Sequence, residues 1–138
     1  MSGSYLLDEQ IGFALRLAGQ RHTAIFQDTI EEELTPTQFS TLIRLSEVGA
    51  SSQNQLGRMV GMDVATTKGV VDRLRKKNLI SSVVDEADVR RRKIQLTDEG
   101  AVLVNRLKRR GKEITRQTLE PLDATEQATL LALLKKIS

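Results

Sequence analysis

Residues 52–77 read SQNQLGRMVGMDVATTKGVVDRLRKK, and this stretch decides the fold. It opens with Ser-Gln-Asn-Gln (52–55), in which a Ser and a Gln three residues apart have the spacing of a capping box at a helix start. Residues 61–63 (Gly-Met-Asp) then supply a turn, because glycine adopts a positive φ easily and aspartate caps a following helix. The stretch predicts two helices, one through about Val60 and one running to Lys77. Two helices joined by so short a turn are typical of a helix-turn-helix.

The second of these helices separates a core face from an exposed face. At 100° per residue, one side gathers the residues that must face the core, Thr67, Val70, Val71 and Leu74. The other side carries small and charged residues, which let a helix approach base edges, and its N-terminal half is the part that reads the major groove in helix-turn-helix proteins. The positions that we expect to contact DNA here are Ala65, Thr66, Lys68, Gly69 and Arg73.

After this helix the pattern changes to that of two strands, 79–84 and 93–96, the second of which alternates polar and apolar residues. Between them lies DEADVRRR (85–92), which is too polar for a core and too long for a tight turn. The segment therefore predicts a β-hairpin with a charged, exposed loop, or wing.

Three consecutive arginines in the wing repel one another unless water or an anion screens them, and a narrow minor groove supplies such an anionic field. We therefore expect a second group of DNA contacts at Arg90, Arg91 and Arg92. Asp88 would hold a guanidinium in place, either that of Arg90 or that of Arg73 on the preceding helix. The spacing leaves both pairings open.

Helical patterns precede and follow this centre. An apolar stripe over residues 6–30 predicts a long first helix, and Thr35-Pro36 starts a second one. Thr97 opens a fifth helix that Pro121 should interrupt or closely follow, and the spacing of Asp123 to Glu126 predicts a capping box before a leucine-rich last helix. The apolar stripe of that last helix is wide enough to need a partner surface, so we expect it to pack on another chain.

The predicted fold class is mainly α with a small β-hairpin wing (α+β), a winged helix-turn-helix flanked by helices from both termini. We expect a single domain over residues 1–138, with the winged helix-turn-helix lobe at 35–100 and dimerisation helices at 5–32 and 101–138. Positive charge is concentrated in residues 68–93, which hold nine Lys and Arg against four Asp and Glu, a net +5 in a chain of net +3. Such a cluster favours a polyanionic partner.

The composition excludes several classes of function. No apolar run approaches the roughly 18 residues of a membrane span, and there is no cysteine for a disulfide, a thiolate metal site or a thiol sensor. One histidine makes a transition-metal centre improbable, and no catalytic constellation has useful spacing. We therefore expect a cytoplasmic protein that is not an enzyme, with no cofactor, no metal and no membrane contact.

The sequence resembles the MarR family of winged-helix regulators. The resemblance rests on Asp88-x-Arg90-x-x-x-Ile94-x-Leu96-Thr97-x-x-Gly100, and it extends to Gln55-Leu56, Gly61-Met62-Asp63 and Val71-Asp72-Arg73-Leu74. It implies a homodimer whose terminal helices interleave and whose protomers each offer a fourth helix to one half-site of a near-palindromic operator. It also implies a repressor released from DNA by a small effector, often an aromatic or phenolic carboxylate.

The chain departs from the family pattern at a few positions. Asn78 replaces the glycine usual after the fourth helix, a change that should leave the fold intact because Asn tolerates a left-handed cap. Ser82 stands where an arginine is common, and Lys68-Gly69 replaces a frequent Thr-Arg pair. These two departures alter phosphate or base contacts.

The only histidine, His22, falls on the apolar stripe of the first helix. One interpretation is a buried or interfacial side chain satisfied by a hydrogen bond. The other is a ligand-binding residue: in a cleft lined by Phe39 and Ile43, His22 would donate to the carboxylate or ring oxygen of a small aromatic acid.

Two further functions remain open at this point. A winged-helix module without an operator could bind another protein through its helical ends, but it would lack salt-sensitive binding to a specific duplex. RNA binding is disfavoured because single-stranded recognition usually relies on stacking aromatics, and all four aromatic residues of the chain lie outside the basic segment. The sequence does not decide between repressor and activator.

Overall fold

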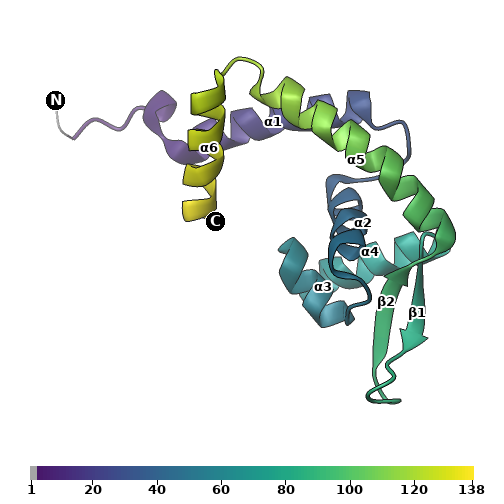
Figure 1. Ribbon diagram of the computed structural model, residues 1–138. Helices are drawn as coiled ribbons and strands as arrows, with labels where there is room; N and C mark the ends of the chain where they lie inside the picture. The colour runs from purple at the N-terminus through teal and green to yellow at the C-terminus, as the bar shows by residue number, and fades with distance from the viewer. Residues whose placement is uncertain (1–2) are drawn as a thin grey trace. The chain divides into compact units, whose positions relative to one another are not determined.

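The computed structural model describes residues 3–138 and shows a mainly helical chain with one antiparallel hairpin (Figure 1), as predicted. Its elements are η1 (Leu7–Glu9, a 3₁₀ turn), α1 (Ile11–Thr29), α2 (Pro36–Val48), α3 (Gln53–Val60), α4 (Val64–Lys76), β1 (Ile80–Val84), β2 (Arg92–Leu96), α5 (Asp98–Leu119) and α6 (Ala124–Lys136). The chain divides into two compact units. One is Glu32–Arg110, and the other combines the residues up to Glu31 with Gly111–Ser138.

The unit Glu32–Arg110 is the winged helix-turn-helix, with its core between α2, α3, α4, the hairpin and the first half of α5. The predicted core face of α4 is buried, with Val71 and Leu74 fully enclosed. The core is completed by the side chains Leu42, Leu45, Leu56, Ile80, Ile94, Leu103, Val104 and Leu107. Burying apolar surface of this kind is the main stabilising contribution to such a unit.

The helix starts follow the predicted caps. Ser52 Oγ accepts from the Gln55 amide at 3.2 Å, and Gln55 Oε1 accepts from the Ser52 amide at 3.3 Å, which is the reciprocal capping box. Asp123 and Glu126 form the same arrangement before α6. Thr35 caps α2 with Pro36 at the first helical position. The side chains of these caps satisfy backbone donors that a helix start leaves free.

The turn between α3 and α4 depends on two glycines, Gly61 in the turn itself and Gly57 within α3. Gly61 takes a left-handed conformation with φ 75°, and the Met62 amide donates to the Gly57 carbonyl at 2.8 Å. A β-carbon at Gly57 would lie 2.5 Å from the Thr67 hydroxyl oxygen, so α3 and α4 approach as closely as they do only because residue 57 has no side chain.

The end of α4 has the left-handed cap that we expected with Asn78 in place of the usual glycine. Asn78 is the one non-glycine residue with a positive φ in the described chain, at 61°. The Asn78 amide donates to the Arg75 carbonyl and the Leu79 amide to the Leu74 carbonyl, which is a Schellman motif. Thr97 then donates its hydroxyl to the Asn78 carbonyl at 2.7 Å. The start of α5 is thereby attached to the end of α4.

The hairpin pairs Ile80 with Leu96 and Val84 with Arg92. A third segment that the sequence pattern did not indicate joins it, because Ser51 and Ile94 exchange backbone hydrogen bonds of 3.0 and 2.7 Å. Ser51 directly precedes the cap of α3. This bridge therefore connects the base of the wing to the start of the helix-turn-helix.

The second unit contains η1, α1, the end of α5 and α6. The predicted first helix over residues 6–30 is wrong at its start, since Gln10 is extended and separates η1 from α1. Arg21 of α1 donates to the Gln117 and Thr118 carbonyls at 2.8 and 2.6 Å, where the last carbonyls of α5 lack helical partners. His22 Nδ1 lies 2.9 Å from Thr118 Oγ1.

Large apolar side chains of this second unit are exposed in the single chain. They are Tyr5, Leu6, Leu7, Ile11, Leu15, Leu17, Leu130, Leu131, Leu133 and Ile137. None of the residues of α6 is buried, and α1 buries Phe26 alone. Apolar surface of this extent marks an interaction site in a soluble protein.

Candidate nucleic-acid interface

The exposed side of α4 begins at its cap. Asp63 accepts the Thr66 amide at 2.7 Å through its carboxylate, and this hydrogen bond lowers the pKa of Asp63 below its usual 3.8. Ala65 and Thr66 are exposed on the first turn, beside the positive end of the helix dipole. Nothing in the unit Glu32–Arg110 covers these two residues.

Further along α4, Lys68 is 72% exposed at its side chain and lies 3.2 Å from Asp72. A solvent-exposed pair of this type contributes little to stability, so the ammonium group can exchange Asp72 for another anion at small cost. A β-carbon at Gly69 would lie 3.3 Å from Arg73 Nη1, which places the Arg73 guanidinium back over the exposed face of α4. The predicted contact residues of α4 therefore share one accessible surface.

The wing has an ordered internal structure. The Asp85 amide donates to the Arg91 carbonyl at 3.0 Å, and the Arg91 amide donates to the Asp88 carbonyl at 2.9 Å. Asp88 Oδ1 accepts from both the amide and the Nε of Arg90, at 3.0 and 3.2 Å. The structure thus pairs Asp88 with Arg90, with Arg91 Nε 3.8 Å from Oδ2, and it gives Asp88 no ion pair with Arg73.

The arginine side chains of the wing nevertheless remain accessible. Those of Arg90 and Arg91 are 87% and 77% exposed, whereas the Asp88 side chain is 31% exposed. Asp88 therefore orients the guanidinium of Arg90 without burying it. Arg92 at the start of β2 is also exposed.

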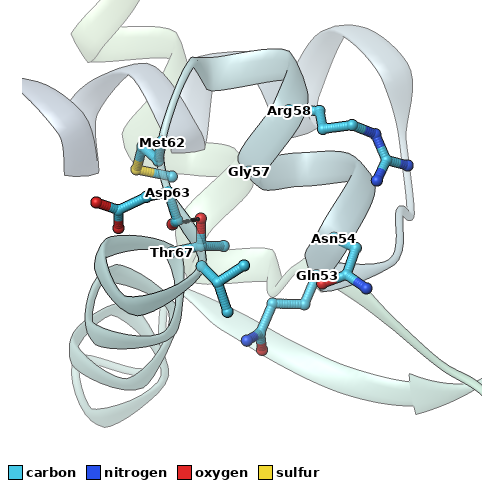
Figure 2. A pocket seen from close by; sticks show the side chains of 8 residues that line it. Gln53, Asn54, Gly57, Arg58, Met62, Asp63 and Thr67 are labelled. Atoms are coloured by element: carbon cyan, nitrogen blue, oxygen red, sulfur yellow. Dashed lines mark hydrogen bonds between the residues drawn. The ribbon is translucent and has the colours of Figure 1, made fainter.

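The sequence pattern did not single out Arg58, a residue of α3 that the structure places on this surface. Arg58 and Asn54 stand one helical turn apart, and both line two hollows. The first hollow, of about 400 Å³, lies between α3 and the start of α4 (Figure 2). The second, of about 630 Å³, lies between α3 and the wing. A lone arginine on a short helix carries no periodic signal, which is why the sequence did not reveal it.

The predicted ligand residues fall in different units. Phe39 and Ile43 line one hollow of about 290 Å³ together with Arg44, Glu47 and Met59. His22 belongs to the other unit, is exposed, and bonds Thr118. A cleft that joins His22 to Phe39 and Ile43 stays a prediction. Among residues 3–138 there is no cluster of metal-binding side chains, and no helix is long and apolar enough to cross a membrane.

An accessible basic helix in a helix-turn-helix, next to an ordered basic wing, defines a winged helix-turn-helix DNA-binding protein. Comparison with known proteins narrows this class. Residues 34–92 match the model of the MarR family. Over 134 residues, or 96% of this chain and 85% of the relative, the sequence is 38% identical to the HTH-type transcriptional repressor NicR of Pseudomonas putida. The chain belongs to the MarR family, and it is a transcription regulator.

Two solved structures extend the comparison. BpsR of Bordetella bronchiseptica, whose DNA binding is regulated by 6-hydroxynicotinic acid, is 38% identical with a TM-score of 0.92 over 98% of this chain and 97% of BpsR. The transcriptional repressor CouR, bound to a 23-mer DNA duplex, is 26% identical with a TM-score of 0.87 over 97% of this chain and 99% of CouR. The winged-helix fold inferred from the sequence is therefore confirmed.

Proposed function

We propose that this regulator is a repressor that binds a near-palindromic operator as a homodimer and leaves it when a small aromatic acid binds. The observation that carries the proposal is the pairing of two accessible basic surfaces in one compact unit, the exposed face of α4 and the wing braced by Asp88. In this arrangement α4 enters the major groove, and Arg90 contacts the adjacent minor groove.

The terminal helices supply the dimer. The exposed apolar residues of η1, α1 and α6 are too many for a protein that stays monomeric. A two-fold symmetric pair would cover them and present one α4 to each half-site, about one helical turn of DNA apart. We assign the terminal segment 5–32 and the part of the segment 101–138 that follows Arg110 to dimerisation, and residues 35–100 to DNA binding. Residues 101–110 belong to the compact unit of the DNA-binding residues and contribute Leu103, Val104 and Leu107 to its core.

The effector class follows from the similarity to BpsR, for which 6-hydroxynicotinic acid is the regulator. An aromatic carboxylate needs hydrogen-bond donors beside an apolar surface. In this chain His22 uses Nδ1 toward Thr118 Oγ1, so its Nε2 is the ring nitrogen left for an acid. Phe39 and Ile43 would provide the apolar side of the site.

The experiment is a mobility-shift titration with the DNA upstream of the protein's own gene, run against unrelated duplex at two salt concentrations. Selective binding that weakens steeply with salt is expected. Adding 6-hydroxynicotinate should then release the DNA. His22→Ala should keep DNA binding and lose release, whereas Thr23→Ala, a neighbouring exposed substitution, should keep both. Release that is unchanged in His22→Ala would refute the role of His22.

The same titration separates this proposal from that of a winged-helix interaction module. Such a module should bind specific and unrelated duplexes equally weakly. Sedimentation of the free protein gives an independent check, because a monomer at micromolar concentration would contradict the dimer.

A further inference from the structure

The hollow between α3 and the wing, here called the α3–wing hollow, is strongly basic. It is lined by Ser52, Asn54, Gln55, Arg58, Asp85, Arg91, Arg92 and Lys93. Four cations therefore face one carboxylate. Asp85 directs Oδ1 to the Ala87 amide at 2.9 Å, inside the wing, and none of the four cations forms an ion pair with it. Asp88 offsets part of this charge, because its Oδ2 lies 3.8 Å from Arg91 Nε, but the hollow still holds more positive than negative charge.

Arg58 is central to this surface. It is the only charged residue of α3, it is exposed, and its guanidinium makes no hydrogen bond or ion pair with the rest of the described chain. In Figure 2 the side chains of Arg58 and Asn54 extend from α3 toward the right of the view, whereas Thr67 of α4 lies on its left. The Arg58 guanidinium therefore has no side-chain partner within the described chain and is free to take an external anion.

The geometry of duplex DNA identifies that anion. The major groove that α4 would enter and the minor groove that the wing would contact are separated by one sugar-phosphate strand. In helix-turn-helix proteins the first helix of the motif crosses this backbone. Here that helix is α3, and it packs against β2 at the base of the wing. The strand between the two grooves must pass α3 and the wing, where the hollow opens.

We propose that the α3–wing hollow binds a phosphate of the DNA backbone strand between the two grooves, with Arg58 as its main ligand. Arg91, Arg92 and Lys93 add charge from the wing side, and Asn54 can donate an amide hydrogen. This site would fix the position of the backbone while α4 reads bases, so its contribution is independent of sequence. The inference rests on the proposed function, because it needs duplex DNA as the partner.

The salt dependence of binding tests the proposal. Each phosphate neutralised contributes about 0.9 to the slope of log K against log salt concentration. Arg58→Ala should weaken binding to operator and unrelated duplex by the same factor, and make the slope shallower by about 1 for each protomer bound. Arg58→Lys should keep most of the slope. Arg44→Ala, measured without effector because Arg44 lines the hollow of Phe39 and Ile43, is the matched control, since Arg44 lies on α2 and already pairs with Glu47 at 2.7 Å.

Ethylation of individual phosphates on the operator gives a second readout. In the unmodified protein, ethylation of a phosphate between the two contacted grooves should block binding, and Arg58→Ala should lose that sensitivity alone. An unchanged slope, or a changed preference among operator sequences, would overturn the assignment while leaving the regulator intact. Failure of the unmodified protein to bind any duplex selectively would instead reject the proposed function itself.

Discussion

Gly100 of α5 lies directly against the main-chain carbonyl of Leu79: a β-carbon at position 100 would fall well under 3.0 Å from the Leu79 oxygen. That oxygen already accepts the Thr97 amide at 3.0 Å, and Thr97 caps α5 through the Gly100 amide. The Thr97-x-x-Gly100 pattern therefore makes a close packing contact between the end of α4 and the start of α5. Both sides of this contact, at Gly100 and at Leu79, are main chain, which cannot rotate away as a side chain can.

Gly100→Ala should accordingly destabilise the protein by about 3 kcal/mol, because overpacking against a fixed backbone forces α5 away from Leu79. The free energy of unfolding in urea at constant protein concentration measures this. Ala101→Ser, which adds one atom at the exposed neighbouring position, is the control and should change stability by less than about 0.5 kcal/mol. Equal stability of the two variants would show that the contact between Gly100 and Leu79 is not tightly packed.

The contact of Gly57 with Thr67 is a similar close contact within the helix-turn-helix, but here the neighbouring atom belongs to a side chain. Gly57→Ala should cost about 1–3 kcal/mol because its β-carbon would meet the buried Thr67 hydroxyl. Thr67→Ala removes that atom together with its hydrogen bond to the Asp63 carbonyl. The double variant should lose less stability than the sum of the single ones. Strict additivity would exclude the contact.

These two glycines show what the sequence could and could not predict. Caps such as Ser52–Gln55 and the core face of α4 depend on residues within a few positions, so their patterns predicted them correctly. The requirement for a glycine at position 100 depends on the contact with Leu79, which is distant in sequence, so only the family resemblance indicated it. The start of α1, the bridge from Ser51 and the position of Arg58 have no local signal. The spacing of the residues could not decide which arginine pairs with Asp88, because that depends on the three-dimensional arrangement of the wing.

Asp63 gives the N-terminus of α4 a predictable dependence on pH. Its pKa in the folded protein is lowered from 3.8 by the hydrogen bond from the Thr66 amide. The ionised carboxylate therefore stabilises the fold above pH 3.8, and this contribution is lost as the pH falls through the lowered pKa. Asp63→Asn keeps a capping oxygen but does not titrate. Its unfolding free energy should fall less than that of the unmodified protein on acidification, measured by urea titrations at several pH values.

Lys68 should affect the choice of sequence, because it lies on the face of α4 that would enter the major groove. Lys68→Ala is expected to change the ranking of operator variants by about 1–3 kcal/mol at one base pair of each half-site. Lys76→Ala removes the same charge from the last turn of α4 and should leave the ranking unchanged. Binding of a randomised operator pool, followed by sequencing, measures both. If Lys68→Ala leaves the ranking of operator variants unaltered, Lys68 does not contact the bases.

Asp88 offers a test in which two physical effects have opposite signs. Removing a carboxylate beside DNA should strengthen binding through simple electrostatics, as we expect for Glu86→Ala, an exposed position in the same loop. Asp88, however, orients Arg90 through hydrogen bonds of 3.0 and 3.2 Å. Asp88→Ala should therefore weaken operator binding, by up to about tenfold, or 1.4 kcal/mol, as the guanidinium gains conformational freedom.

The double variant decides whether Asp88 acts through Arg90. Arg90→Ala alone should weaken binding to all duplexes, and adding Asp88→Ala should weaken it no further, because no guanidinium remains at position 90 to be oriented. Fluorescence anisotropy titrations of a labelled operator give the four affinities. Tighter binding by Asp88→Ala, matching the effect of Glu86→Ala, would mean that the carboxylate only repels DNA, and the pairing seen in the wing would then have no role in recognition.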